Sequence, residues 1–294
     1  MDFAKEKERI VLYLRTKLEE ERKDGFVFGL SGGIDSAVVA YLLKEAVGRD
    51  RVLALIMPDL DSDPSSKGDA LLIARLLGIR YRVFPITEVI RSIGAYREVP
   101  LWILLFRHLK ARIVNRIYER YTEILNKPLF FAIKDRIDPR LYWFNKGKAY
   151  YSVKHRIRMA ILYFFAEKEN YMVAGCTNLT ERLIGFYVRY GDDASDIAPI
   201  SHLYKTEVIE LAKFLKVPEK IIEKPPTPDL IPGITDEGSI GFSYKDIDSL
   251  LKNFEDGKSS EEINENFDRK MISLLYEQYI WVKEQNKKPW RLER

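Results

Sequence analysis

The segment Phe26–Ala37 carries the residue types best suited to hold a phosphate. It has a short apolar run, a turn Ser31-Gly32-Gly33, and the start of a helix near Asp35 and Ser36. Adjacent glycines permit positive φ and let a ligand approach the backbone closely. The first turn of a helix presents free N–H groups at the positive end of its dipole. We expect this turn to bind a phosphate or a pyrophosphate.

Asp35 stands where the anion should lie, and no lysine follows the glycines, so the segment is not a Walker loop. A carboxylate repels a phosphate unless a cation lies between them. Mg²⁺ takes one or two carboxylates together with phosphate oxygens, which makes Asp35 a candidate ligand. The simpler alternative is that Asp35 and Ser36 only cap the helix.

A second group of polar residues follows a predicted strand at 171–175. Glu181, in Gly175-Cys-Thr-Asn-Leu-Thr-Glu181, is a candidate second carboxylate for the same metal, or else a first-turn residue of a helix capped by Asn178 or Thr180. Lys205 opens a predicted helix at 204–215, where it would meet a phosphate or simply face solvent. Downstream of Arg189, three aspartates stand at positions 192, 193 and 196, either in a site or in a solvated loop.

Strands alternate with helices through the parts of the chain that carry these residues. We expect strands at 25–30, 51–57, 79–84 and 171–175, and helices at 3–22, 34–47, 69–77, 86–95 and 152–168. This alternation predicts an α/β fold, a doubly wound parallel sheet with helices on both faces. Ligands of such sheets bind at the carboxyl ends of the strands, where Ser31–Ser36 and Gly175–Glu181 both fall.

The remaining segments are predicted less regularly. A basic helix is expected at 107–125, no regular structure is assigned to 128–151, and helices are expected at 244–251 and 261–283. The Pro- and Gly-rich stretch 224–241 is expected to be a mobile loop that acts as a lid or as a plain connection.

Composition limits the classes of protein that fit. The 294 residues are enough for one large domain or two small ones, and the 46% apolar content can fill a substantial core. The single cysteine, Cys176, excludes intramolecular disulfides and cysteine-rich metal sites. There is no signal-peptide pattern, and the longest apolar run is too short to span a bilayer, so we expect a cytoplasmic protein without a membrane partner. Residues 97–148 hold 12 Lys and Arg against 5 Asp and Glu, so the basic charge is local.

A series of motifs resembles one family. Ser-Gly-Gly-Ile-Asp-Ser at 31–36 is similar to the signature of the ATP pyrophosphatases, whose fold is adenine nucleotide alpha hydrolase-like. Five further motifs follow in order, at Thr177–Glu181, Tyr190–Asp192, Leu203–Thr206, Pro225–Leu230 and Thr235–Glu237. Together they resemble ammonia-dependent NAD synthetase, over about residues 1–95 and 150–290. The resemblance implies a single domain, 1–294, with a basic, aromatic-rich and mostly helical insertion at about 97–150.

The resemblance also implies a reaction and a site. Mg-ATP adenylates the carboxylate of deamido-NAD, ammonia displaces AMP, and the products are NAD, AMP and pyrophosphate. Mg²⁺ would lie on Asp35 and Glu181. Deamido-NAD would meet Arg156, Arg189 and Asp196, and Asp192 would capture or deprotonate ammonium. ATP would contact Gly29, Leu30, Ser31, Gly32, Gly33, Ile34, Asp35, Ser36, Cys176, Lys205 and Thr227.

Several positions depart from the family pattern. Cys176 replaces a threonine, Arg189 replaces a lysine, Ser152 replaces an asparagine, and Gln285-Asn286 replaces a His-Lys pair. These departures affect the deamido-NAD positions more than the ATP and Mg²⁺ positions. No glutaminase domain is recognised, so ammonia would come free or from a separate glutaminase subunit, and by resemblance the chain forms a homodimer.

Two other activities remain open on the same fold. One is an adenylating amidoligase that acts on a different carboxylate. The other is a tRNA-modifying ATP pyrophosphatase, because Arg107, Lys110, Arg112, Arg116 and Arg120 offer cations for a nucleic acid. An apolar face shared by the same segment favours packing against protein instead, so nucleic acid is the weaker alternative.

Overall fold

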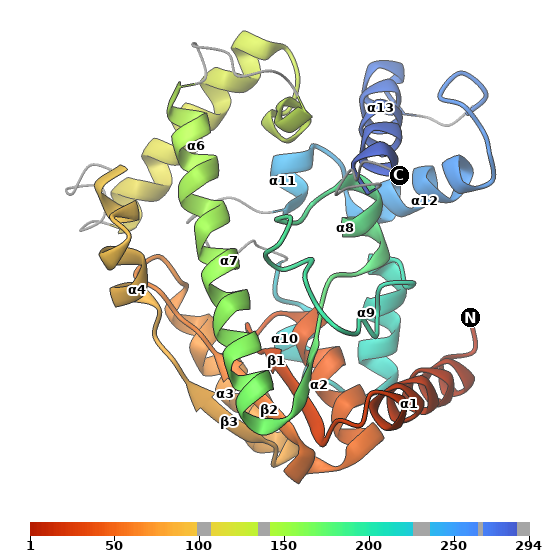
Figure 1. The fold of residues 1–294 in the computed structure, drawn as a ribbon. Helices are drawn as coiled ribbons and strands as arrows, with labels where there is room; N and C mark the ends of the chain where they lie inside the picture. Colours follow the sequence, from red (N-terminus) through yellow and green to blue (C-terminus); the bar gives the residue numbers. More distant parts are fainter. Residues whose placement is uncertain (99–106, 135–141, 226–235, 264–266, 287–294) are drawn as a thin grey trace, which may run out of the picture.

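A parallel sheet lies at the centre of the computed structural model, which describes the chain except residues 99–106, 135–141, 226–235, 264–266 and 287–294. Within the described residues the sheet has four strands in the order β3-β2-β1-β4 (Figure 1). The strands are β1 (Gly25–Gly29), β2 (Val52–Ile56), β3 (Arg80–Val83) and β4 (Tyr171–Ala174). Every neighbouring pair is parallel. The predicted fold class is confirmed.

Burial explains the composition of each strand. β2 and β4 are buried throughout, and β1 is buried except at its last residue, because helices cover both faces of the sheet. β3 reads Arg-Tyr-Arg-Val and is largely exposed, as suits an edge strand, where charged side chains discourage pairing with another chain. Beyond β4, Ala174 forms a further parallel bridge with Ile197.

Successive side chains of a strand point to opposite faces, so β1 contributes to two cores. Phe26 and Phe28 pack with one layer of helices, and Val27 packs with the other. The first layer holds α1 (Phe3–Glu20), α2 (Ile34–Val47), α3 (Pro64–Leu77), α9 (Lys205–Phe214) and α10 (Glu219–Ile222). The second holds α4 (Thr87–Ser92) and α7 (Tyr142–Glu169). Two short 3₁₀ turns, η1 (Arg49–Arg51) and η2 (Ala95–Glu98), connect these elements.

A third apolar core forms beyond the carboxyl edge of the sheet. It joins α8 (Leu179–Ile184), α11 (Asp236–Ile240), α12 (Tyr244–Glu255), α13 (Arg269–Gln285) and the 3₁₀ turn η3 (Leu129–Lys134). Phe130 and Phe131 of η3 are buried in it. Tyr118 of α6 (Arg107–Leu125) donates a hydrogen bond to the carbonyl oxygen of Ser239. Part of the segment expected as an insertion is therefore built into this core.

Four helices differ most clearly from the prediction. α7 begins at Tyr142, so residues 142–151, to which no structure was assigned, continue the helix expected from 152. α3 begins at Pro64 because Asp63 accepts a hydrogen bond from the backbone N–H of Ser65 and caps the helix. α11 lies inside the stretch expected to be a loop, and α13 begins only at Arg269, after the N-cap Asp268.

A buried lysine fixes α7 to the loop after β2. The Lys154 side chain is fully buried, and its Nζ lies 2.6 Å from a carboxylate oxygen of Asp59 and 2.6 Å from one of Asp61. The hydroxyl of Tyr150 also donates to Asp61. Four residues further along α7, Arg158 donates two hydrogen bonds to the carbonyl oxygen of Met57, at 3.1 and 3.0 Å. These contacts set the position of α7 over the end of β2.

Among the described residues, no helix combines the length and the apolar character that crossing a bilayer requires.

We predict that Lys154→Met lowers the free energy of unfolding by about 3–5 kcal/mol, because it removes the buried cation that pairs with the carboxylates of both Asp59 and Asp61. Urea unfolding followed by circular dichroism measures the change. Lys213→Met is the control, because Lys213 forms a largely exposed pair with Glu210, 2.7 Å apart, and should unfold like the wild type. A Lys154→Met protein as stable as this control would contradict the prediction.

Candidate functional site

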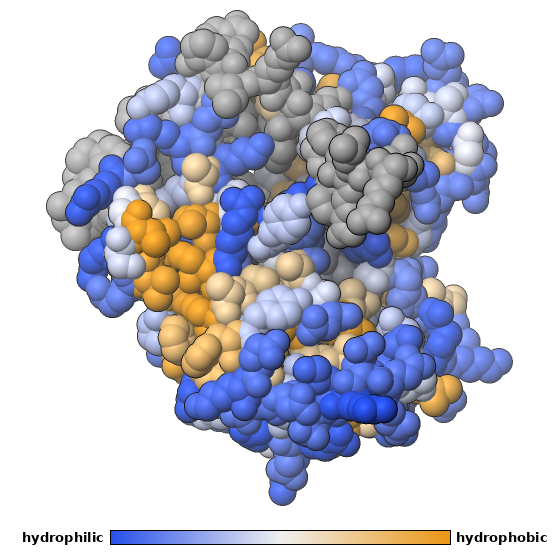
Figure 2. Space-filling view, in the orientation of Figure 1, coloured by the Kyte–Doolittle hydropathy of each residue, from blue (hydrophilic) through white to orange (hydrophobic). Residues whose placement is uncertain are grey.

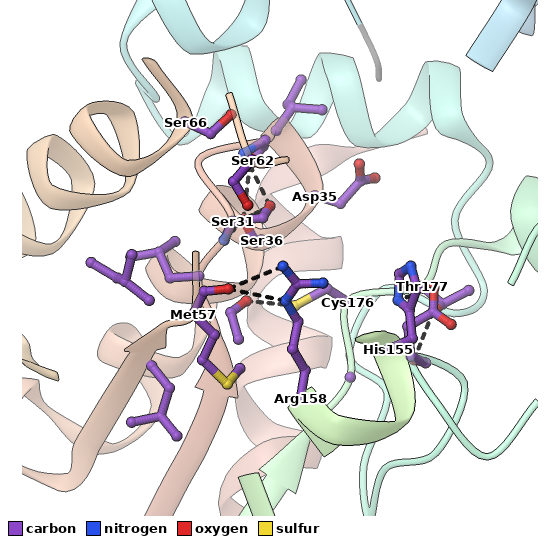
Figure 3. Close-up of a pocket in the computed structure, with 18 of the residues that line it drawn as sticks. Ser31, Asp35, Ser36, Met57, Ser62, Ser66, His155, Arg158, Cys176 and Thr177 are labelled. Atoms are coloured by element: carbon purple, nitrogen blue, oxygen red, sulfur yellow. Dashed lines mark hydrogen bonds and ion pairs between the residues drawn. The ribbon is translucent and has the colours of Figure 1, made fainter. Parts of the chain in front are cut away.

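The carboxyl ends of β1, β2 and β4 meet at a cavity of about 300 Å³. Figure 3 shows the side chains that face it, with the serines at one end and Met57 and Cys176 lower in the same view. The wall includes Gly29, Leu30, Ser31, Gly33, Ile34, Asp35 and Ser36, as well as Cys176, Glu181, Asp192 and Lys205. The two sequence segments predicted to hold ATP thus lie at one cavity.

The Ser31-Gly32-Gly33 turn is held in place by side-chain hydrogen bonds of Ser31 and Ser36. The Oγ of Ser36 accepts from the backbone N–H of Ser31 at 3.2 Å and donates to the carbonyl oxygen of Gly33 at 3.0 Å. Gly32 has φ +85°, and a Cβ there would lie 2.4 Å from the carbonyl oxygen of Ser66, so only glycine fits. α2 begins at Ile34, and no side chain caps the N–H groups of its first turn. Those donors remain for an anion.

A pair of polar contacts joins Asp35 to Asn178 and to Lys205 across the cavity. One Asp35 carboxylate oxygen accepts from the side-chain amide of Asn178 at 3.0 Å, and the other pairs with Nζ of Lys205. Lys205 is only 2% exposed. Burial acts to lower the pKa of Lys205, but the charges of Asp35 and Glu181 raise it above its ordinary value. Lys205 is therefore a buried cation, and its alternative role as a surface lysine is excluded.

Glu181 is both a helix cap and a cavity residue. The Asn178 side chain accepts from the backbone N–H of Glu181 at 3.0 Å, and the Glu181 carboxylate accepts from that of Asn178 at 3.1 Å. This is a capping box at the start of α8. Glu181 also lines the cavity, and burial together with the charge of Asp35 raises its pKa well above the ordinary value. The two alternatives drawn from sequence are compatible.

The pair Asp35 and Glu181 suits a divalent cation. The two carboxylates come from different strand ends and line one cavity, and the charge of Asp35 contributes to raising the pKa of Glu181. A cation placed between them would offset their negative charge, and oxygen ligands of this kind fit Mg²⁺ when phosphate oxygens and water complete its shell. The described residues contain no group of three or more His, Cys, Asp or Glu that could hold a metal without such help.

Asp192 and His155 lie together at another part of the wall. One Asp192 oxygen accepts from the backbone N–H of Val188 at 2.7 Å, and the other lies 3.4 Å from Nδ1 of His155. Burial raises the pKa of Asp192 to about 6. Burial, with the charges of Arg158 and Lys154, lowers the pKa of His155 to about 3. Near neutral pH this part of the cavity therefore presents a carboxylate beside a neutral imidazole.

The residues expected to meet deamido-NAD do not line this cavity. The guanidinium of Arg156 donates to the carbonyl oxygen of Arg189 at 3.2 Å, and that of Arg189 donates to the carbonyl oxygen of Gln285. Asp196 accepts from the backbone N–H of Val173 at 2.7 Å and from the Tyr163 hydroxyl at 3.1 Å. Arg156 and Arg189 are thus neighbours. Thr227, which was expected to contact ATP, lies outside the described residues.

Other cavity residues were not predicted from the sequence. Tyr151, His155, Arg158, Met159 and Leu162 all line the cavity from α7. Their spacing along the chain puts them on one helix face, and four of the five lie within the helix predicted at 152–168, so this pattern was readable from the sequence. Asp236 and Lys224, on either side of the undescribed stretch 226–235, also reach the cavity wall.

Asp236 adds a third carboxylate near Lys205. It is 5% exposed, and one of its oxygens accepts from the Tyr244 hydroxyl at 2.9 Å, while the other is buried without a partner among the described residues. Burial raises the pKa of Asp236 to about 6. Keeping this group ionised therefore costs folding free energy near neutral pH.

We predict that Asp236→Asn raises the free energy of unfolding above pH 6 by about 2 kcal/mol or less. The native pKa of about 6 exceeds the ordinary value of 3.8, so the wild type loses stability as the pH rises from 4 to 6, whereas the amide does not titrate. Urea unfolding at pH 4 and pH 8 measures the difference. A gain of the same size at both pH values would contradict the assignment.

The fold and the site define a nucleotide-binding α/β enzyme: a parallel sheet covered on both faces, with a rigid glycine turn, a buried lysine and two carboxylates at its carboxyl edge. The chain belongs to the NAD synthase family, whose model matches residues 6–127 and 110–288. It is 48% identical to the NH₃-dependent NAD⁺ synthetase of Coprothermobacter proteolyticus over 98% of each chain. It is 46% identical to that of Thermotoga maritima over 93% of this chain and 96% of the relative. The family predicted from the sequence motifs is confirmed.

Solved structures agree with this assignment. The NMN synthetase of Francisella tularensis has a TM-score of 0.72 and 26% identity, and the match covers 100% of this chain and 99% of that one. The NH₃-dependent NAD synthetase of Campylobacter jejuni, solved with a nitrate ion, has a TM-score of 0.70 and 28% identity over 100% of both chains.

Proposed function

We propose that this protein is an AMP-forming carbon–nitrogen ligase that converts deamido-NAD, ATP and ammonia into NAD, AMP and pyrophosphate. The observation that carries the proposal is the 48% identity to an NH₃-dependent NAD⁺ synthetase over nearly the whole of both chains. The Asp35–Lys205 pair beside Glu181 at the glycine turn supports it. This arrangement suits transfer of the adenylyl group of ATP.

Adenylation solves the chemical problem posed by a carboxylate, which is a poor electrophile. An oxygen of the acceptor carboxylate attacks the α-phosphorus of ATP, and the bond to the β-phosphate oxygen breaks. Ammonia then attacks the acyl carbon, and AMP leaves with the electron pair of the broken C–O bond. The donors of the Ser31–Gly33 turn and the ammonium of Lys205 stabilise the negative charge that moves onto the departing pyrophosphate.

Asp35 and Glu181 would hold Mg²⁺ in this site. When bound, the ion supplies Lewis-acid neutralisation of the phosphate charge. The capping box fixes Glu181 to the start of α8, and Asn178 fixes Asp35, so both carboxylates are oriented before substrate arrives. Cys176 and Thr227 are proposed as further ATP contacts, Cys176 because its Sγ lies 3.8 Å from the carbonyl oxygen of Gly29 at the end of β1.

Arg156, Arg189 and Asp196 are proposed to bind deamido-NAD outside the ATP cavity, where the two arginines are neighbours. Asp192 would accept the proton that ammonium must lose before it attacks. Its pKa of about 6 leaves it ionised near neutral pH. We further propose that the chain works in the cytoplasm as a homodimer and as one functional domain, with ammonia either free or delivered by a separate glutaminase.

The direct test is an assay of the purified protein with Mg-ATP, ammonium and either deamido-NAD or nicotinate mononucleotide. Deamido-NAD should give NAD with one AMP and one pyrophosphate per turnover. The second acid tests the activity named for the Francisella tularensis neighbour. If only nicotinate mononucleotide is amidated, the proposed substrate is wrong but the adenylation chemistry stands. If neither acid causes release of AMP, both the proposed substrate and the adenylation chemistry are overturned.

We predict that Asp35→Asn and Glu181→Gln each lower kcat at least about 100-fold while the fold is retained, because each removes a ligand of the ion that neutralises the phosphates. Glu207→Gln is the matched control. Glu207 occupies the same third position of α9 and accepts from the backbone N–H of Tyr204 at 2.9 Å, but it does not line the cavity. Its variant should keep wild-type kcat. Activity of Glu181→Gln equal to that of Glu207→Gln would remove Glu181 from the metal site.

We predict that Cys176→Thr leaves the KM for ATP within about threefold of the wild type. Burial raises the pKa of the Cys176 thiol, so the side chain is a neutral group of similar size to a threonine hydroxyl. Steady-state kinetics with varied ATP measures the effect. A large loss of kcat would instead assign Cys176 a role of its own.

A further inference from the structure

Two lysines from neighbouring positions pair with one buried carboxylate. Asp69 of α3 is 1% exposed. Nζ of Lys220 lies 2.7 Å from one of its oxygens, and Nζ of Lys224 lies 2.9 Å from the other. Burial acts to raise the pKa of Asp69, but hydrogen bonds from the two lysines lower it. Asp69 therefore carries one negative charge between two positive ones.

The two lysines differ in what else they reach. The Lys220 side chain is 68% exposed and is not part of the cavity wall. The Lys224 side chain is 22% exposed, lines the cavity, and also donates to the hydroxyl of Ser66 at 3.0 Å. Lys224 is thus the member of the pair whose charge faces the proposed ATP site.

Lys224 lies beside the phosphate-binding turn. The first turns of α3 pack directly on Gly32, since a Cβ at Gly32 would lie 2.4 Å from the carbonyl oxygen of Ser66 and 3.1 Å from Cβ of Asp69. Ser66 and Asp69 are also the two residues that hold Nζ of Lys224. Figure 3 shows Ser66 and Ser62 at the same end of the cavity as Ser31 and Ser36.

The charge and the number of hydrogen-bond donors of Lys224 favour an anion beside it. A lysine ammonium has three N–H donors, and two of those of Lys224 go to Ser66 and Asp69 among the described residues. Lys220 already balances the charge of Asp69. The N-terminus of α3 lies next to that of α2, and both are 14-residue helices whose dipoles favour negative charge.

We propose that Lys224 contacts the terminal phosphates of ATP and retains that contact with the pyrophosphate leaving group, held in place by Asp69 and Ser66. This inference rests on the proposed function and adds a substrate-binding residue to it. Lysine acts in such sites as a compact positive charge. A purely structural role, in which Lys224 only ties the segment after α10 to α3, is the competing explanation.

The test compares Lys224→Met with Lys220→Met, because both remove one partner of Asp69 and only the first removes a charge from the cavity. For Lys224→Met we expect roughly a 10- to 100-fold rise in the KM for ATP and in the inhibition constant of pyrophosphate. The KM for deamido-NAD should stay within twofold. Lys220→Met should stay within twofold of the wild type in every constant, and Lys224→Arg should recover most of the ATP affinity.

Equal kinetic effects of Lys224→Met and Lys220→Met, or a loss of thermal stability without a change in the KM for ATP, would overturn the proposal in favour of the structural tie. If Lys224→Met does not fold, Lys224→Gln keeps hydrogen bonds to Asp69 and Ser66 without the charge, and calorimetry with pyrophosphate gives the same comparison. A wild type that binds pyrophosphate but makes no NAD would count against the proposed function and leave the Lys224 contact standing.

Discussion

The buried ammonium of Lys205, paired with Asp35 and close to Glu181, is the interaction on which the site depends. The carboxylates of Asp35 and Glu181 line the same cavity, and burial together with the charge of Asp35 raises the pKa of Glu181. The positive charge of Lys205 offsets part of the negative charge of the two carboxylates. Their charges in turn raise the pKa of Lys205 and keep it protonated. A site built this way has carboxylates that a metal ion can satisfy, and a buried cation beside the glycine turn at which we propose that phosphates bind.

The rest of the fold keeps these groups in register. Ser31 and Ser36 tie the glycine turn together, Asn178 joins Asp35 to the capping box of α8, and Lys154 fixes α7 over the end of β2. Each contact is made by side chains that follow a buried strand or lie on a packed helix. The groups of the proposed site are therefore oriented by packed elements and their side-chain contacts, which lowers the cost of reaching a reactive geometry.

The sequence predicted the parallel sheet, and with it the meeting of the glycine turn and Glu181 at one cavity, because their signals are local. A buried strand followed by glycines and a helix is recognisable from a dozen residues, and α2 and α6 match their predicted bounds. The long extent of α7 was missed because residues 142–151 are rich in aromatics and lack a clear cap, so their helical state depends on packing. Nothing in the sequence around Lys154 indicates that it pairs with two aspartates from another loop, a contact that only the three-dimensional structure shows. The placement of Arg156 and Arg189 beside each other, outside the cavity, has no local signal either.

Titration calorimetry of the wild-type protein with ATP, in the presence of Mg²⁺ and again with a chelator, tests the central claim most directly. If the two carboxylates and Lys205 form a site that needs a divalent ion to accept phosphates, Mg²⁺ should tighten ATP binding at least about tenfold. Equal ATP affinity with and without Mg²⁺ would contradict the role assigned to Asp35 and Glu181.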